Sequence, residues 1–147
     1  MTKSEIELLD RAGVKIFGDL SYRGKCCVES AEQSAFFSHL RRQYGRTWGA
    51  LALHPRNEGL IRGAQFATIA RAKSEGMTKG AADIIIPGKV SFVCEMKRRD
   101  LTKSAFQSGQ IDYLIAAKNA GAFSCLALGY DAAWQALQEW IAGHEKA

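Results

Sequence analysis

The sequence lacks the cysteine and histidine spacings that bind zinc. Its four cysteines are Cys26, Cys27, Cys94 and Cys125, and they include no C-x-x-C pair and have no His-x-His pair nearby. These absences argue against a zinc finger or another structural zinc site. Cys94 and Cys125 lie in apolar runs, where free cysteines behave as small core residues. This usage is typical of a reducing compartment, so we expect a cytoplasmic protein.

Long apolar runs, repeats and low-complexity linkers are absent as well. The first residues, MTKSEIELLDRAG, are charged and contain no apolar segment of the kind found in signal peptides. No stretch is apolar over the roughly 20 residues that a membrane helix needs, so we expect no membrane partner. The 147 residues are of single-domain length, and they are enough to bury a core without disulfides or metals.

Charge is only modestly unbalanced, with a formal net charge of +5. A basic excess of this size fits a polyanionic partner such as nucleic acid, although many proteins without such a partner share it. The basic residues gather around Arg41, Arg42 and Arg46, and again from Lys97 to Lys103. Net charge alone does not identify the binding partner, so this inference depends on the sequence motifs.

The spacing of apolar residues predicts a mixed α/β domain. Between Glu29 and Tyr44, for example, Phe36, Phe37 and Leu40 recur on one helical face. Residues 14–28 carry no clear pattern. The predicted helices cover residues 4–13, 29–44, 59–76, 104–121 and 131–144, and the predicted strands cover residues 47–55, 82–87, 90–97 and 122–130. This order predicts a sheet with helices packed on it.

A predicted hairpin, ADIIIPGKVSFVCEMKRRD (residues 82–100), carries charges in otherwise apolar strands. Because side chains alternate along a strand, Glu95 and Lys97 share one face. Asp83 begins the first strand, which is apolar enough to be covered on both sides, so its carboxylate needs a cation or strong hydrogen bonds. The plainer interpretation is a surface ion pair between Glu95 and Lys97.

The length of the hairpin loop decides where Asp83 points. A two-residue loop would place Asp83 opposite Phe92, on the wrong face. A three-residue loop would place it on the face of Glu95 and Lys97. We predict the three-residue loop, which brings two carboxylates and an ammonium together. Two carboxylates with room for water are typical of a Mg²⁺ or Mn²⁺ site.

Asp83 followed by Glu95-x-Lys97 resembles the motif of the PD-(D/E)xK nuclease superfamily. Further segments resemble its VRR-NUC family in the family's order: ESAEQSAFFSHL, LHPRNEG, EGMTKGAADIIIPG, FVCEMKRRD and AGAFSCLALGYDAAWQAL. The resemblance covers roughly residues 29–140. It implies a restriction-endonuclease-like fold with a mixed central sheet flanked by helices. We therefore predict a nuclease domain over residues 29–147, preceded by an extension of unknown role over residues 1–28.

The resemblance implies roles for individual residues. Asp83 and Glu95 would be the metal ligands, with the backbone carbonyl of Met96 as a third. Lys97 would be the catalytic lysine, although a plain salt bridge to Glu95 stays open. Gln110 stands where the family has a glutamine at the head of the next helix, near the metal-bound water.

The family also has a glutamate in the opening helix, and two are available here. Glu29 falls closer than Glu32 to the apolar face of that helix, and it precedes Gln33 by four residues, as in the family. The residues Ser30 to Gln33 read as a capping box, however, which would leave Glu29 just outside the helix. We prefer Glu29 as the catalytic carboxylate and keep Glu32 as the alternative.

Several further residues are predicted to contact nucleic acid. They are the basic or polar residues near the proposed site: Arg41, Arg42, Asn57, Arg98, Arg99 and Lys103. Phosphate contacts need such groups but carry no sequence information. No recognition helix or zinc finger is visible, so selection of DNA structure is expected over a restriction-type code. His54 is interpreted as an ordinary surface or core histidine.

The sequence therefore predicts a Mg²⁺- or Mn²⁺-dependent DNA endonuclease that hydrolyses phosphodiester bonds. Action as a homodimer on branched DNA, four-way junctions included, is implied by the resemblance alone. Two other functions remain open: a nucleic-acid-binding module that keeps the fold without cleavage, and a metal-free structural domain with an ion pair in its hairpin.

Overall fold

The computed structural model describes residues 1–55 and 66–146, so the predicted contact from Asn57 lies outside the described residues. The centre of the fold is a four-stranded mixed sheet in the order β1-β4-β3-β2. Its strands are β1 (Lys15–Phe17), β2 (Ile84–Ile86), β3 (Phe92–Lys97) and β4 (Phe123–Leu128). β1 and β3 run parallel to β4, and β2 runs antiparallel to β3. The predicted mixed α/β architecture is confirmed.

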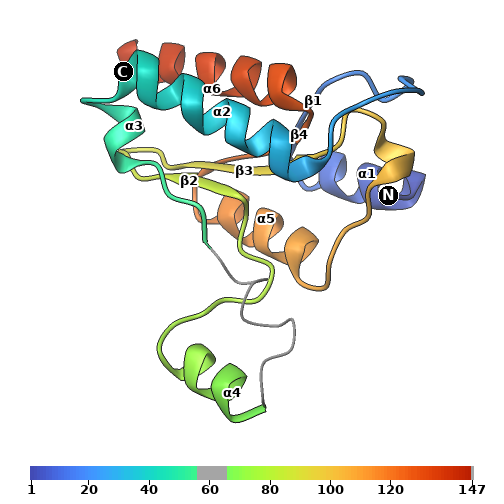
Figure 1. The fold of residues 1–147 in the computed structure, drawn as a ribbon, viewed down its shortest axis with the longest axis vertical. Helices are drawn as coiled ribbons and strands as arrows, with labels where there is room; N and C mark the ends of the chain where they lie inside the picture. The colour runs from blue at the N-terminus through green and yellow to red at the C-terminus, as the bar shows by residue number, and fades with distance from the viewer. Residues whose placement is uncertain (56–65, 147) are drawn as a thin grey trace.

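Helices cover both faces of this sheet (Figure 1). α2 (Glu29–Tyr44), α3 (Trp48–Leu51) and α6 (Tyr130–Glu145) lie on one side, and α1 (Lys3–Arg11) and α5 (Gln110–Asn119) lie on the other. Side chains of β3 alternate between the two faces of the sheet, so they contribute to the core on each face. Phe92 and Cys94 join the core under α2 and α6, whereas Val93 joins Leu114 of α5 in the core on the opposite face.

The first 28 residues contribute to the same sheet and core. β1 forms an edge strand beside β4, and Leu9 and Val14 are buried against α5. A short arm then leads from β1 to α2, and it is held by side chains that follow β3. Arg98 donates hydrogen bonds to the carbonyl oxygens of Cys26 and Cys27, at 3.1 and 3.2 Å. Residues without a clear sequence pattern thus take their structure from partners far along the chain.

The segment 47–55 was predicted as a strand, and this prediction is wrong. Residues 48–51 form the short helix α3, and only Leu53 pairs with a strand residue, Ile85. Gly49 allows this packing, because a Cβ atom there would lie 2.9 Å from the carbonyl oxygens of Leu40 and Tyr44 in α2. The apolar run is buried by a helix pressed on another helix, a contact that local pattern does not reveal.

Two predicted helices are shorter in the structure. The helix predicted over residues 104–121 begins only at Gln110, because Gly109 adopts a left-handed conformation with φ of 92°. A short 3₁₀ helix, Leu101–Lys103, precedes it. The helix predicted over residues 59–76 is described from Phe66 to Ser74 as α4, and its earlier residues lie outside the described part. Within the described residues, no helix has the length and apolar character needed to cross a membrane.

Candidate active site

The hairpin between β2 and β3 brings Asp83 to the face of Glu95, as predicted, but through a longer loop. Ile84 pairs with Cys94 and Ile86 with Phe92, so the loop has five residues, 87–91, and the predicted length of three is wrong. Continuing this register places Asp83 opposite Glu95. An odd loop length preserves the face, which is why the placement holds although the length does not.

Packing against α6 explains the extra loop residues. The indole nitrogen of Trp140 donates a hydrogen bond of 2.8 Å to the carbonyl oxygen of Val90. A Cβ atom at Gly88 would lie 3.3 Å from the ring of Trp140 and 3.2 Å from His144 Nε2. The loop therefore curls onto α6, and a three-residue turn would not reach these partners.

Asp83 is held by backbone groups at the start of the hairpin. Its Oδ2 accepts a hydrogen bond of 3.0 Å from the backbone N–H of Met96. His54 Nδ1 donates to the backbone carbonyl oxygen of Asp83 at 2.7 Å. Burial raises the pKa of Asp83 to about 6, although the Met96 N–H and the Lys97 ammonium favour the charged form. The sequence placed His54 in a loop without a role, and only the fold brings it to Asp83.

Glu95 carries a carboxylate whose charge is strongly disfavoured by its surroundings. Its side chain is 1 % exposed, and neither carboxylate oxygen accepts a well-aligned hydrogen bond from the described residues. Lys97 Nζ lies 3.0 Å from Glu95 Oε1 as an ion pair. Burial, followed by the nearby Asp83 carboxylate, raises the pKa of Glu95 to about 8, with Lys97 acting in the opposite direction. A buried carboxylate of this kind is stabilised by a bound cation.

Lys97 is buried beside Glu95 and is anchored on its other side by α5. Its ammonium donates a hydrogen bond of 3.0 Å to Gln110 Oε1. Burial disfavours the charge of Lys97, but Glu95 and Glu29 outweigh it, so the pKa of Lys97 is raised and the ammonium form persists. The ion pair between Glu95 and Lys97 exists, yet with Lys97 only 2 % exposed it is not the surface pair of the plainer interpretation.

Gln110 occupies the predicted position at the first residue of α5. Its Oε1 accepts from Lys97 and also from the backbone N–H of Gln107, at 2.7 Å. Two glycines hold this helix start in place: a Cβ atom at Gly80 would lie 2.2 Å from the carbonyl carbon of Gly109. The segment that leads to Asp83 is thus pressed directly against the residue before Gln110.

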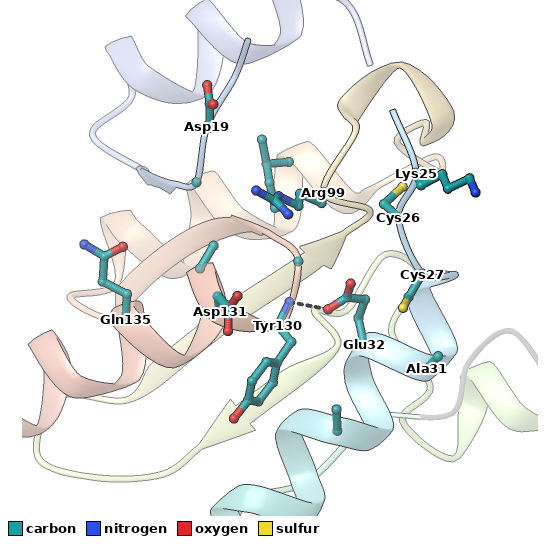
Figure 2. A pocket seen from close by; sticks show the side chains of 15 residues that line it. Asp19, Lys25, Cys26, Cys27, Ala31, Glu32, Arg99, Tyr130, Asp131 and Gln135 are labelled. Carbon is teal, nitrogen blue, oxygen red and sulfur yellow. Dashed lines mark hydrogen bonds between the residues drawn. The ribbon is translucent and has the colours of Figure 1, made fainter. Parts of the chain in front are cut away.

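The two candidate glutamates of α2 point to different places. Glu29 Oε1 accepts a hydrogen bond of 2.8 Å from Ser104 Oγ, and Glu29 lines a cleft together with Asp83 and Glu95. Glu32 instead accepts a hydrogen bond from the backbone N–H of Tyr130, at the start of α6 (Figure 2). No capping box forms at Ser30, since α2 begins at Glu29 itself. The geometry therefore brings Glu29, and not Glu32, to the carboxylates of the hairpin.

The cleft that contains these groups is open and has a volume of about 840 Å³. Arg41 and His54 line it beside the three carboxylates of Glu29, Asp83 and Glu95. Among the described residues, no three His, Cys, Asp or Glu side chains form a metal-binding set by themselves. A cation here would therefore draw on backbone carbonyls, water or substrate oxygens as well, which is usual for Mg²⁺. The side chain of Met96 is buried in the core, which leaves only its backbone for a ligand role.

The residues predicted to contact nucleic acid lie in different parts of the structure. Arg41 lies 5.3 Å from the centre of the Phe37 ring at the cleft. Arg98 binds the arm before α2, and Lys103 donates to the carbonyl oxygen of Gly24 at 2.7 Å. Arg42 is exposed on α2. The structure thus brings one of the predicted basic residues to the cleft itself.

Arg99 lines a second cavity of about 570 Å³, shown in Figure 2, and the residues that line this cavity do not include Asp83 or Glu95. Its guanidinium lies 4.0 Å from the centre of the Tyr22 ring. Glu32 and the thiols of Cys26 and Cys27 also line this cavity. Because Glu32 already occupies the start of α6, this cavity offers no clear anion site.

Comparisons with known proteins bear on the fold. No protein-family model matches the sequence, and no curated protein matches it. A solved structure described as "VRR_NUC domain protein" superimposes with a TM-score of 0.61 and 20% sequence identity, covering 80% of this chain and 91% of that chain. At this identity the match shows the fold. The chain has a VRR-NUC-like fold, a mixed sheet flanked by helices, as the sequence motifs predicted.

Proposed function

We propose that this protein is a metal-dependent endonuclease that hydrolyses DNA phosphodiester bonds, with the cleft between α2, β2 and β3 as its active site. The observation that carries the proposal is the buried carboxylate of Glu95, which accepts no well-aligned hydrogen bond from the described residues and lies beside Lys97 and opposite Asp83. Two carboxylates and one ammonium on a nuclease-like scaffold match the chemistry of phosphodiester hydrolysis. The VRR-NUC-like fold supports the same class of reaction.

Asp83 and Glu95 would hold Mg²⁺ or Mn²⁺, together with the backbone carbonyl of Met96. The residues present fit such an ion, because the Glu95 oxygens accept no well-aligned hydrogen bond from the described residues and burial disfavours the charged forms of both Asp83 and Glu95. When bound, the ion supplies an activated water and neutralises charge on the phosphate. Asp83 is aimed for this role by the Met96 N–H on one side and is backed by His54 on the other.

Lys97 supplies a fixed positive charge in the site. Its ammonium is held between Glu95 Oε1 and Gln110 Oε1, both at 3.0 Å, so it is positioned before substrate arrives. A preorganised charge in a buried site stabilises developing negative charge at little cost in reorganisation. Lys97 thus orients the attacking water or stabilises the phosphate, and Gln110 acts as a positioning residue for Lys97.

Glu29 completes the set of acidic groups at the cleft. Ser104 Oγ holds one of its oxygens and also accepts a hydrogen bond of 3.0 Å from the backbone N–H of Arg98. The residue after Lys97 is therefore tied to Glu29 through one hydroxyl. We assign Glu29 to binding water or the hydrated ion at the α2 side of the cleft, and Arg41 to a phosphate beside it.

Selection of branched DNA by a homodimer is a separate proposal, which light scattering and junction substrates would test.

The test compares cleavage and binding in the same samples. Supercoiled plasmid is incubated with wild type, Glu95→Gln and Lys97→Ala, in Mg²⁺, in Mn²⁺ and in EDTA. We expect nicking or cutting by wild type only with metal, and single-turnover rates at least about a hundredfold lower in both variants. DNA affinity should stay within about tenfold, which corresponds to about 1.4 kcal/mol.

Metal binding has its own readout in thermal unfolding. A cation that binds only the folded protein stabilises it by about 2.7 kcal/mol at a hundred times its dissociation constant. Mg²⁺ or Mn²⁺ should therefore raise the Tm of wild type, and it should have little effect on Glu95→Gln. Folded variants that cut like wild type would refute this active site. DNA binding without cleavage by wild type in either metal would instead support the binding-module function.

A further inference from the structure

The helix α4 (Phe66–Ser74) projects away from the sheet and its covering helices (Figure 1). It contains no buried residue, and the side chain of Phe66, its first residue, is 92 % exposed. A free helix shorter than about 12 residues is marginal in water, because most helical stability comes from packing an apolar face. α4 therefore contributes little to the core, which suggests that it serves an interaction outside this domain.

The attachment points of α4 lie at the candidate active site. On the chain leading toward it, Leu53 pairs with Ile85 and His54 donates to the Asp83 carbonyl. On the chain returning from it, Gly80 is pressed against Gly109, and three residues later the chain reaches Asp83. The return segment is thus anchored next to the start of α5. The chain segments before and after α4 thus include residues that line the cleft, namely Leu53, His54 and Asp83.

The charge of this projection is mostly positive. Residues 66–80 contain Arg71, Lys73 and Lys79 and one acidic residue, Glu75. Arg71 pairs with Glu75 at 2.9 Å, but the two side chains are 80% and 62% exposed. Exposed pairs of this kind contribute at most about 1 kcal/mol, so a phosphate can compete for the guanidinium. Lys73 forms no ion pair with a described residue.

A DNA-cleaving cleft needs such groups near it. Glu29, Asp83 and Glu95 line the cleft and repel phosphates. Arg98 and Lys103, which follow the site in sequence, are hydrogen-bonded to carbonyl oxygens of the arm before α2. Most of the affinity for a nucleic-acid backbone comes from Lys and Arg side chains that replace counterions. Arg71 and Lys73 of α4 are exposed, and the chain that returns from α4 leads to Asp83.

We propose that α4 is a DNA-binding arm, in which Arg71 and Lys73 bind backbone phosphates of the duplex next to the bond that is cut. This inference rests on the proposed function and adds the part of the substrate that the cleft does not hold. Contacts of this kind position the duplex without reading its sequence. They also give α4 the partner that its exposed surface lacks within the described residues.

The test measures DNA affinity against salt concentration by fluorescence anisotropy. All proteins carry Glu95→Gln, so that the duplex stays intact. The arm variant adds Arg71→Ala and Lys73→Ala, which keeps helix propensity high. The matched control adds Lys3→Ala and Arg11→Ala, two exposed basic residues of α1, away from the cleft. The charge-keeping variant Arg71→Lys with Lys73→Arg completes the set.

We expect the arm variant to bind about tenfold more weakly at moderate salt, and its log–log salt slope to fall by about two, since each lost phosphate contact removes about 0.9. The control and the charge-keeping variant should stay within about twofold of the Glu95→Gln parent. Circular dichroism checks the fold, and light scattering checks the oligomeric state.

Three results would overturn the inference. If the arm variant keeps the parent affinity and slope while wild type still cuts DNA with Mg²⁺, the arm is not a DNA contact and the proposed function stands. If wild type neither binds nor cuts DNA, the proposed function fails and the inference fails with it. If the arm variant turns a dimer into a monomer, α4 is a contact between two copies of the chain.

Discussion

Replacement of Gly80 by alanine tests how the active site is assembled. Gly80 has a positive φ of +77°, and an added Cβ would lie 2.2 Å from the carbonyl carbon of Gly109 and 2.6 Å from the backbone nitrogen of Gln110. Ordinary contact begins at 3.4 Å, so one of the two backbones has to move by on the order of 1 Å. The obstacle is main chain, and it cannot rotate away as a side chain would.

Two contributions set the expected loss of stability. The left-handed conformation costs an alanine about 1–2 kcal/mol. Forcing extra volume into a close contact adds about 1–3 kcal/mol. We expect Gly80→Ala to lower the free energy of unfolding by about 2–5 kcal/mol, measured by urea denaturation with circular dichroism.

Gly121→Ala is the matched control, because it separates the two contributions. Gly121 has a similar φ of +94°, but no described atom lies within 4 Å of its added Cβ. It should lose only the conformational part, about 1–2 kcal/mol. Equal losses in the two variants would refute the close contact between Gly80 and Gly109.

The backbone displacement in Gly80→Ala should also slow DNA cleavage. Gln110 follows Gly109 and holds the ammonium of Lys97 at 3.0 Å. Because a misplacement of about 1 Å can cost about a hundredfold in rate, the single-turnover rate of folded Gly80→Ala should fall by about that factor. The rate of Gly121→Ala should stay within about threefold of wild type. A Gly80→Ala enzyme with the wild-type rate would show that the start of α5 does not position Lys97.

Three further predictions concern single carboxylates. The Thr102 side chain and other hydrogen-bond donors lower the pKa of Asp100 to about 2, so its stabilising effect is present above about pH 4 and is lost as the pH falls from 4 toward 2. Asp100→Asn should therefore be less stable than wild type in urea at pH 6, with a smaller difference at pH 3, and an unchanged difference would contradict this. Glu29→Gln should slow single-turnover cleavage at least about tenfold. Glu32→Gln should instead lose about 1 kcal/mol of stability at the start of α6, where it binds the Tyr130 N–H, with cleavage within about twofold of wild type.

The sequence by itself determined the faces of the hairpin and the order of the main elements. The period of two along a strand places Glu95 and Lys97 on one side of β3 whatever surrounds it. The helical period identified α2 and α6, and the resemblance of several segments over residues 29–140 implied the VRR-NUC-like fold that the similar solved structure supports. The strand faces and the helices depend on residues close together in the chain, so local pattern is sufficient to predict them.

The tertiary structure decided the features that depend on distant partners. The hairpin loop has five residues because Trp140 holds Val90, and Glu32 turns away from the cleft because Tyr130 offers an N–H at the start of α6. The sequence predicted Arg98 as a phosphate ligand. In the structure its guanidinium instead donates hydrogen bonds to two carbonyl oxygens of the arm before α2, 71 and 72 residues earlier in the chain. In each case several hydrogen-bond partners are possible, and the fold decides which of them lies within about 3 Å of the side chain.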